Sequence, residues 1–171
     1  MKIFFLIVIV LLSSLIGYLY GEGFRNRLIQ LRELKRTLID FENDIVYAYT
    51  PLPDSIDRIG EKAKSPIKEL LITISKKLKN NEVNNVYIAF YESINEHKKN
   101  MSLKNKDYEI LLDLSKSLGE TNIDGQVKIF NLAKEKLDYE LAIAEEECNK
   151  NTKVYRYLGV GVGAMIAIFL V

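Results

Sequence analysis

The chain has 171 residues, enough for one domain with appended segments. Its 24 basic and 23 acidic side chains nearly balance, which argues against a dedicated nucleic-acid binder, because such proteins normally carry a basic excess. One cysteine cannot form a disulfide within the chain, and one histidine cannot build a histidine-based metal site. Gly and Pro are scarce and Lys, Glu, Leu and Ile abound, a composition typical of helical proteins.

The first feature in chain order is an uncharged apolar run over residues 3–20. As a helix this run would be roughly 27 Å long, close to the thickness of a bilayer's hydrocarbon core. The alternative is a cleaved signal peptide. Only Lys2 precedes the run and no small-x-small site follows it cleanly, so we expect an uncleaved membrane helix over residues 1–21.

A second apolar run, YLGVGVGAMIAIFLV, occupies residues 157–171. With residues 154–156 added, and with Arg156 reaching back to the interface, the segment 154–171 is long enough to span a membrane. A buried core helix is the alternative, but such helices seldom carry so unbroken an apolar end. We expect a second transmembrane helix.

Flanking charge predicts the orientation of both segments. Lys2 alone precedes the first segment, and no basic residue follows the second within the sequence. Basic residues instead gather on the inner side of each segment, at Arg25, Arg27, Arg32, Lys35, Arg36, Lys150, Lys153 and Arg156. Both asymmetries place the middle of the protein in the cytoplasm and both termini outside.

The middle, residues 22–153, has helical periodicity. One apolar face with steps of three and four is formed by Phe24, Leu28, Leu31, Leu34, Leu38, Phe41 and Ile45. A second is formed by Ile123, Val127, Phe130, Ala133, Leu137, Leu141, Ala144 and Cys148. This second face predicts a long helix that begins near Asp124 and continues into the C-terminal apolar segment.

Shorter helices are expected between these two. Ser65 and Pro66 are typical of an N-cap followed by Pro at the first helical position, Ser102 of another N-cap, and Gly119 of a residue just past a helix end. No stretch alternates with period two. The sequence therefore predicts an all-α protein: an antiparallel helical bundle of about six helices between N- and C-terminal transmembrane helices.

The stretch YAYTPLPD, residues 47–54, predicts a corner between two helices. Thr50 suits an N-cap and Pro51 the first helical position, so Thr50, Pro51 and Leu52 would end one helix and begin the next. Tyr47 and Tyr49 cannot face the same way on a helix, so at least one is expected to be exposed or to point to a neighbouring element.

Candidate chemistry is sparse. The acids at 145–147 and at Asp40, Glu42 and Asp44 fit a solvated face better than a metal or acid–base site, and His97 fits a surface histidine. Cys148 lies on an apolar stripe and is expected to be a core or helix-contact residue. We expect no catalytic residue, cofactor or metal, and no enzyme.

Four glycines form two pairs with a spacing of four: Gly17 with Gly21, and Gly159 with Gly163. The run from 159 to 163 lacks the Gly-Lys-Ser/Thr ending of a phosphate loop. Two hypotheses remain open: a packing seam between membrane helices, or incidental small residues.

The chain resembles the stage III sporulation protein AB family along nearly its whole length. The residues that carry the resemblance are Glu42, Ile45, Tyr47, Thr50, Pro51, Leu52, Leu118, Gly119, Asp124, Gln126, Asn151, Lys153, Leu158 and Gly159, together with the leading apolar segment. The family commonly has Trp in the middle helix, where this chain has Phe90.

The resemblance implies a role that composition does not. This family is similar to the inner-membrane platform protein of type II secretion and type IV pilus systems. Its members act during endospore formation, in the mother-cell membrane around the forespore, within a channel-like complex. The implied partners are a cytoplasmic secretion-type ATPase, stage III sporulation protein AA, and the other membrane and ring-forming proteins of that complex.

We therefore expect a non-enzymatic platform subunit whose bundle recruits the ATPase. The residues expected to contact this partner are Arg32, Arg36, Glu42, Tyr47 and Tyr49. The alternative function is a membrane-anchored sensor or binding protein whose helical bundle lies outside the cell. Homo-oligomerisation is left open.

Overall fold

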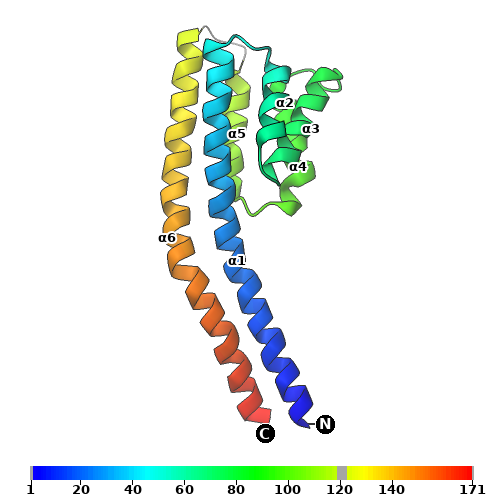
Figure 1. Cartoon of the computed structure of the whole chain (residues 1–171), viewed down its shortest axis with the longest axis vertical. Helices are drawn as coiled ribbons and strands as arrows, with labels where there is room; N and C mark the ends of the chain where they lie inside the picture. The colour runs from blue at the N-terminus through cyan, green and yellow to red at the C-terminus, as the bar shows by residue number, and fades with distance from the viewer. Residues whose placement is uncertain (1, 119–122, 171) are drawn as a thin grey trace. The chain divides into compact units, whose positions relative to one another are not determined.

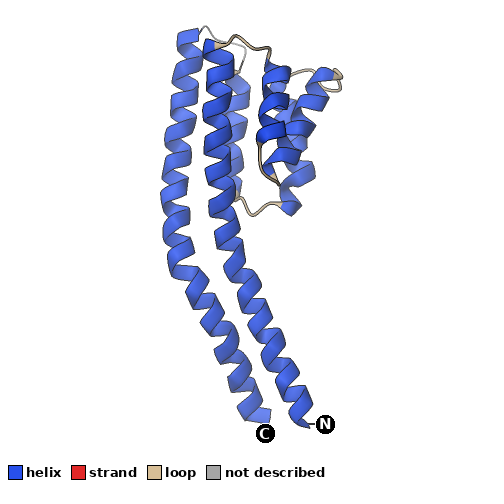
Figure 2. Ribbon diagram, viewed as in Figure 1, coloured by secondary structure: helices blue, strands red, loops and turns tan. Residues whose placement is uncertain are grey.

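The computed structural model describes residues 2–118 and 123–170, and in these ranges every regular element is helical (Figures 1 and 2). This confirms the predicted all-α fold class. The elements are α1 (Lys2–Glu42), a π-helical turn (Asn43–Tyr47), α2 (Leu52–Lys62), α3 (Ile67–Lys79), α4 (Val86–His97), a 3₁₀ turn (Lys98–Asn100), α5 (Asn105–Ser117) and α6 (Ile123–Leu170).

The chain divides into two compact units. The first, which we call the helix pair, contains residues 1–28 and 142–171; the second, which we call the bundle, contains residues 29–141. The domain boundaries expected from the sequence, after residues 21 and 153, follow the ends of the apolar segments and stay a prediction. Each unit is described by itself below.

The bundle has one apolar core, to which α1 to α6 all contribute. Leu31, Ile67, Leu70, Ile74 and Phe130 are fully buried. Phe130 of α6 meets Phe41 of α1 edge to face, with the ring centroids 5.5 Å apart. Fully burying one such side chain stabilises a fold by about 1.5–3 kcal/mol. The apolar helix faces that meet in this core therefore contribute strongly to the stability of the bundle.

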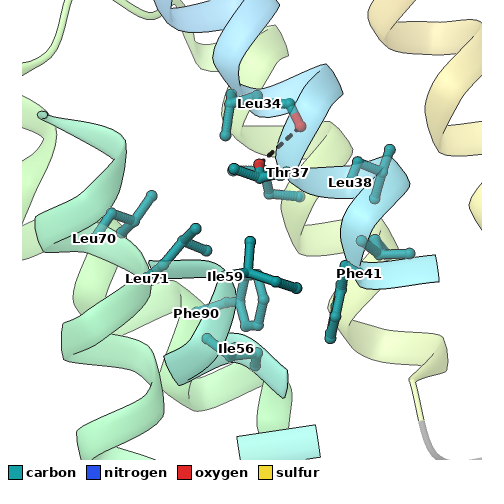
Figure 3. A pocket seen from close by; sticks show the side chains of 11 residues that line it. Leu34, Thr37, Leu38, Phe41, Ile56, Ile59, Leu70, Leu71 and Phe90 are labelled. Carbon is teal, nitrogen blue, oxygen red and sulfur yellow. Dashed lines mark hydrogen bonds between the residues drawn. The ribbon is translucent and has the colours of Figure 1, made fainter. Parts of the chain in front are cut away.

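A small cavity of about 30 Å³ remains in this core (Figure 3). Its walls are apolar except for Thr37, whose hydroxyl donates a hydrogen bond to the Leu34 carbonyl at 2.9 Å. Ligand pockets are roughly ten or more times larger. The cavity is therefore a packing gap in the core.

Three predicted helix starts differ from the structure. The helix after the corner begins at Leu52, with Pro51 rather than Thr50 at the cap position and no side-chain cap. The hydroxyl of Ser65 donates to Glu69 at 2.6 Å, and α3 begins at Ile67. α5 begins at Asn105 rather than after Ser102.

A polar partner on α1 explains the shift at Ser102. The Ser102 N–H donates to the Gln30 side chain of α1 at 2.9 Å, so this residue anchors the connection instead of capping a helix. The α4 cap, which the sequence analysis did not single out, is Asn85, whose Oδ1 accepts the Ile88 N–H at 2.8 Å. The helix end expected at Gly119 lies outside the described residues.

Candidate interaction site

In the helix pair, the N-terminal part of α1 and the C-terminal part of α6 touch through their glycines. A Cβ atom built on Gly17 would lie 2.5 Å from the Tyr155 carbonyl oxygen and 2.9 Å from Gly159 Cα. One built on Gly163 would lie 3.0 Å from Val10 Cα. One built on Gly21 would lie 3.2 Å from the Thr152 carbonyl oxygen. All four predicted glycines therefore lie at the contact between the two helices.

Two hydroxyl groups support this contact. Ser13 Oγ donates to the Gly159 carbonyl at 2.7 Å, and Thr152 Oγ1 donates to the Gly21 carbonyl at 3.4 Å. Small residues that allow close backbone approach, together with hydroxyl groups that bond across helices, are typical of helices packed in lipid. The sequence analysis missed both hydroxyl groups, although Ser13 lies four residues before Gly17.

Aromatic and charged side chains follow at the bundle-side end of the apolar segments. The Tyr155 ring stacks on Tyr20 and Phe24, at centroid distances of 5.8 and 5.6 Å. Arg156 forms an ion pair with Glu22 at 3.0 Å and lies 4.8 Å from the Tyr18 ring centroid. This combination is typical of a membrane–water interface, where tyrosine and arginine combine an apolar body with a polar end.

A buried ion pair lies beyond this belt. Arg27 of α1 bonds Glu147 of α6 at 3.0 Å, and the Arg27 side chain is almost fully buried. Glu147 belongs to the acidic run at 145–147, which the sequence analysis placed on a solvated face. For Glu147 the structure differs, because the carboxylate is partly buried and balances the charge of Arg27.

In the connection between α1 and α2, which we call the tyrosine corner, two tyrosines are exposed to solvent. Tyr47 ends the π-helical turn and Tyr49 has a positive φ of 51°, a conformation that few residues other than glycine adopt. Each tyrosine is 69% exposed. Both side chains are therefore available for contact, whereas the sequence required only one of them to be exposed or to reach a neighbour.

A buried carboxylate holds this corner in place. Asp44 is buried; its Oδ2 accepts a hydrogen bond from Ser55 Oγ at 3.1 Å and another from Arg58 Nε at 3.0 Å. The Thr50 N–H donates to the Asp44 carbonyl at 2.9 Å. The expectation of a solvated Asp44 was wrong, because its partners on α2 remove it from water and satisfy its charge.

Glu42 is also buried, and Lys134 of α6 forms an ion pair with it at 2.6 Å. Glu42 was expected on a solvated face, but its carboxylate is buried in the bundle and paired with Lys134. Asp40, the third acid of this group, is partly exposed and lies 3.4 Å from Arg36. This arrangement leaves Glu42 poorly placed to touch a partner.

Arg36 ties α1 to the end of α2. Its guanidinium bonds the buried carboxylate of Glu33 at 2.5 Å and the Lys62 carbonyl at 3.1 Å. The hydrogen bond from Arg36, helped by the Lys64 N–H, lowers the pKa of Glu33 despite its burial. The paired carboxylate in turn raises the pKa of Arg36. Arg32 is exposed on α1 and, like Arg36, already interacts within the protein.

The remaining candidate groups have structural partners. His97 is half-buried, and its Nε2 lies 2.9 Å from the Thr73 hydroxyl, so it links α4 to α3 rather than standing on an open surface. Cys148 is partly buried in the helix pair, 3.8 Å from the Thr152 hydroxyl. Among the described residues, no group of three or more His, Cys, Asp or Glu could hold a metal ion.

One helix among the described residues, near the N-terminus, is long and apolar enough by length and composition to cross a membrane. This helix includes the first apolar segment. The C-terminal segment does not meet the same test over its described residues, so its membrane insertion stays a prediction.

Comparison with known proteins agrees with this architecture. Residues 2–171 match the family described as stage III sporulation protein AB. Stage III sporulation protein AB of Bacillus subtilis (strain 168) is 26% identical over 170 residues, which are 99% of each chain. A solved structure of a stage III sporulation protein AB is 28% identical and has a TM-score of 0.67, over 72% of this chain and 96% of that one.

The fold and these contacts define a class: a protein whose described residues form helices, with a cohesive bundle and a candidate membrane helix near the N-terminus. Within that class, the chain belongs to the stage III sporulation protein AB family, because the family match covers nearly all of its residues.

Proposed function

We propose that this chain is a non-enzymatic platform subunit of a secretion-like complex between mother cell and forespore. In this proposal, the helix pair lies in the mother-cell-derived membrane and the bundle lies in the cytoplasm. The bundle couples a cytoplasmic ATPase of the stage III sporulation protein AA type to the membrane and ring components. Membership of the family supports the sporulation setting.

The observation that carries the proposal is the glycine-to-glycine contact of the helix pair. Gly17 and Gly159 face each other at a distance that only backbone atoms allow. Because the segment around Gly17 is apolar enough to span a membrane, a partner packed on it so closely would share its environment. Two helices inserted as a hairpin would anchor the bundle by both of its ends.

The topology can be tested with a reporter fused after Val171 in the full chain. Because basic residues flank the inner side of both segments, the reporter is expected to behave as extracytoplasmic. A second reporter, inserted between Asn80 and Asn81 at the exposed end of α3, is the matched control and is expected to behave as cytoplasmic. A cytoplasmic signal at Val171 would overturn the hairpin.

For the ATPase contact, the tyrosine corner is the best supported of the expected residues. Exposed tyrosines supply large contact area at low entropic cost and are frequent hot spots of protein interfaces. Tyr47 and Tyr49 are exposed, and the carbonyl of buried Asp44 accepts the N–H of Thr50, the residue just after them. Arg32 stays within the proposed contact. Arg36 and Glu42 contribute by shaping α1, since exposed Arg36 bonds Glu33 and buried Glu42 bonds Lys134.

Capture of the ATPase by the full chain in detergent micelles tests this assignment. Replacing both Tyr47 and Tyr49 by Ser is expected to weaken capture by about tenfold or more, as loss of two hot-spot residues does. Tyr91→Ser is the control, because Tyr91 is another exposed tyrosine, at 50%, but lies on α4. Undiminished capture by the double variant would remove the corner from the interface.

The second candidate, an extracytoplasmic sensor with a ligand between its helices, requires a cavity of a few hundred Å³. The core cavity of the bundle, at about 30 Å³, is far smaller. A groove of about 430 Å³ between α5 and α6 is large enough, but it is open to solvent and lined by charged side chains, among them Glu109, Asp113 and Lys136. The platform hypothesis therefore fits the bundle better.

A further inference from the structure

Three cations gather around one acid at the bundle-side end of the apolar segments, within the helix pair. Glu22 of α1 forms ion pairs with Arg156 of α6 at 3.0 Å and with Arg25 of α1 at 3.5 Å. Lys153 precedes Arg156 by three residues, so it lies one turn away on the same side of α6. Lys153 is exposed, and no ion pair holds it within the part of the chain that the structure describes. We call Arg25, Lys153 and Arg156 the cation cluster.

The other acids of these two helices do not balance the cluster. Three positive charges around Glu22 leave an excess of two. On α1 the next acid is Glu33, eleven residues further along, where Arg36 bonds it. On α6 no acid follows Glu147, and Glu147 pairs with the buried Arg27 at 3.0 Å. The cluster is therefore a site of local positive charge in a chain whose charges nearly balance overall.

Apolar surface adjoins the cation cluster on both helices. Arg156 lies 4.8 Å from the ring centroid of Tyr18, which belongs to the first apolar segment. Leu15 comes one turn before Tyr18, Val160 comes one turn after Arg156, and both are exposed. Because residues three or four apart share a helix face, Leu15 and Val160 lie on the same side as Tyr18 and Arg156. This side of the helix pair thus has a positive end and an apolar end.

We propose that Arg25, Lys153 and Arg156 bind the headgroup phosphate of an anionic phospholipid whose acyl chains lie along Leu15 and Val160. The inference rests on the proposed insertion of the helix pair. Guanidinium groups suit this ligand, because their N–H donors match phosphate oxygens in pairs. A soluble phosphate would occupy the cations but leave the adjoining apolar surface uncovered, so a lipid fits better. Since the cluster draws on both helices, a bound lipid would hold them together at the membrane surface.

The test uses the full chain with Val160→Trp in vesicles that contain phosphatidylglycerol and phosphatidylcholine in equal parts. The sequence has no other tryptophan, so position 160 alone gives tryptophan fluorescence. Bromine atoms on the acyl chains of a lipid quench this fluorescence on contact. Two vesicle preparations of the same composition, which differ only in the lipid that is brominated, compare the two lipids at the site. We expect brominated phosphatidylglycerol to quench more strongly.

Neutralising the cation cluster should remove this preference. Each of Arg25→Gln, Lys153→Gln and Arg156→Gln is expected to lower the association of phosphatidylglycerol relative to phosphatidylcholine by up to about fivefold, the effect of one cation at an anionic lipid surface. In the triple variant the two lipids should quench equally. Lys2→Gln is the matched control, because Lys2 lies at the other end of the same apolar segment, about 24 Å along α1 from Tyr18. It should keep the preference.

The remaining outcomes separate this inference from the proposed function. Equal quenching by the two brominated lipids before any cation is replaced would overturn the inference, as would an equal loss of preference with Lys2→Gln. A greater loss in inorganic phosphate than in chloride of the same ionic strength would assign the cluster to a soluble phosphate instead. Quenching by brominated phosphatidylcholine shows that a variant is inserted. Absence of quenching by either lipid would contradict the proposed insertion itself.

Discussion

The helix pair and the bundle bring helices together in different ways. In the helix pair, the contact is between backbones: a Cβ atom on Gly159 would lie 2.8 Å from the Ser13 carbonyl oxygen. In the bundle, side chains such as Leu31, Leu70 and Phe130 fill the space between helices and are fully buried.

This difference follows from the two solvents that the proposal assigns. Water drives apolar side chains of the bundle together, because burying them releases it from their surface. Lipid gives no such drive, since its tails are as apolar as leucine, so helices there associate through close packing and polar bonds. In the helix pair, the glycines allow close packing and the Ser13 hydroxyl makes a polar bond across the helices. The predictions below test whether the two regions respond differently to substitution.

The largest effect is expected at Gly17. Replacing it by Ile would force a side chain against the Tyr155 carbonyl and Gly159 Cα, which are backbone atoms that cannot turn aside. We expect the two helices to separate. Chemical crosslinking between Tyr20→Cys and Tyr155→Cys, in a Cys148→Ser background, should fall several-fold.

Gly161→Ile is the control for this prediction. Gly161 lies on the same stretch of α6, but a Cβ atom there would have nothing within 4 Å. Crosslinking should stay at its original yield. If both substitutions reduced it equally, the loss would come from glycine itself and not from the helix contact.

In the bundle, Phe130→Ala should be the most damaging core substitution. It removes a fully buried ring and its contact with Phe41, and leaves a cavity, at a cost of about 3–5 kcal/mol in the free energy of unfolding. Urea unfolding of the full chain in micelles, followed by circular dichroism, measures it. Leu132→Ala, on the same helix but half-exposed, should cost far less.

Asp44→Asn tests the buried charge beneath the tyrosine corner. It weakens the bonds to Ser55 and Arg58, and because Arg58 is half-exposed we expect a moderate cost of about 1–3 kcal/mol. Asp40→Asn, at a more exposed carboxylate on the preceding turn, should be nearly neutral. An equally small effect at both positions would mean that the corner does not depend on Asp44.

The sequence predicted the helices well and the polar partners poorly, for one physical reason. The faces of α1 and α6 were visible because burial repeats every three or four residues along a helix. The partners of Asp44 and Glu42 were not, since Arg58 and Lys134 lie 14 and 92 residues away along the chain. Periodicity shows which side of a helix is buried, but it does not show which charged residue of another helix pairs with a buried acid.

The helix starts illustrate the same limit on a smaller scale. Ser102 has the residue type of an N-cap, yet its backbone bonds Gln30, which is 72 residues away. The glycine contact, by contrast, was one of two open hypotheses from spacing alone, because Gly17 and Gly21 had to share a helix face. A sequence shows which residues share a helix face, because their spacing repeats. It does not show which distant residues are bonded to each other, because that depends on the three-dimensional fold.

The smallest predicted effect depends on pH and concerns Glu33. Its folded-state pKa is lowered from 4.5, mainly because Arg36 donates a hydrogen bond to the carboxylate. A lowered pKa means that the ionised carboxylate stabilises the fold fully above pH 4.5, and that this stabilisation is lost as pH falls through the folded-state pKa. Glu33→Gln should therefore destabilise the bundle by about 1–2 kcal/mol near neutral pH.

This gap between the original chain and Glu33→Gln should shrink in acid, and urea unfolding at a series of pH values measures it. Glu61→Gln, at an exposed carboxylate on α2, is the control and should give a small difference at every pH. A gap for Glu33→Gln that persists below the folded-state pKa would show that Glu33 stabilises the bundle by packing. A gap that closes would show that its charge holds α1 to the end of α2, because Arg36 bonds both Glu33 and the Lys62 carbonyl.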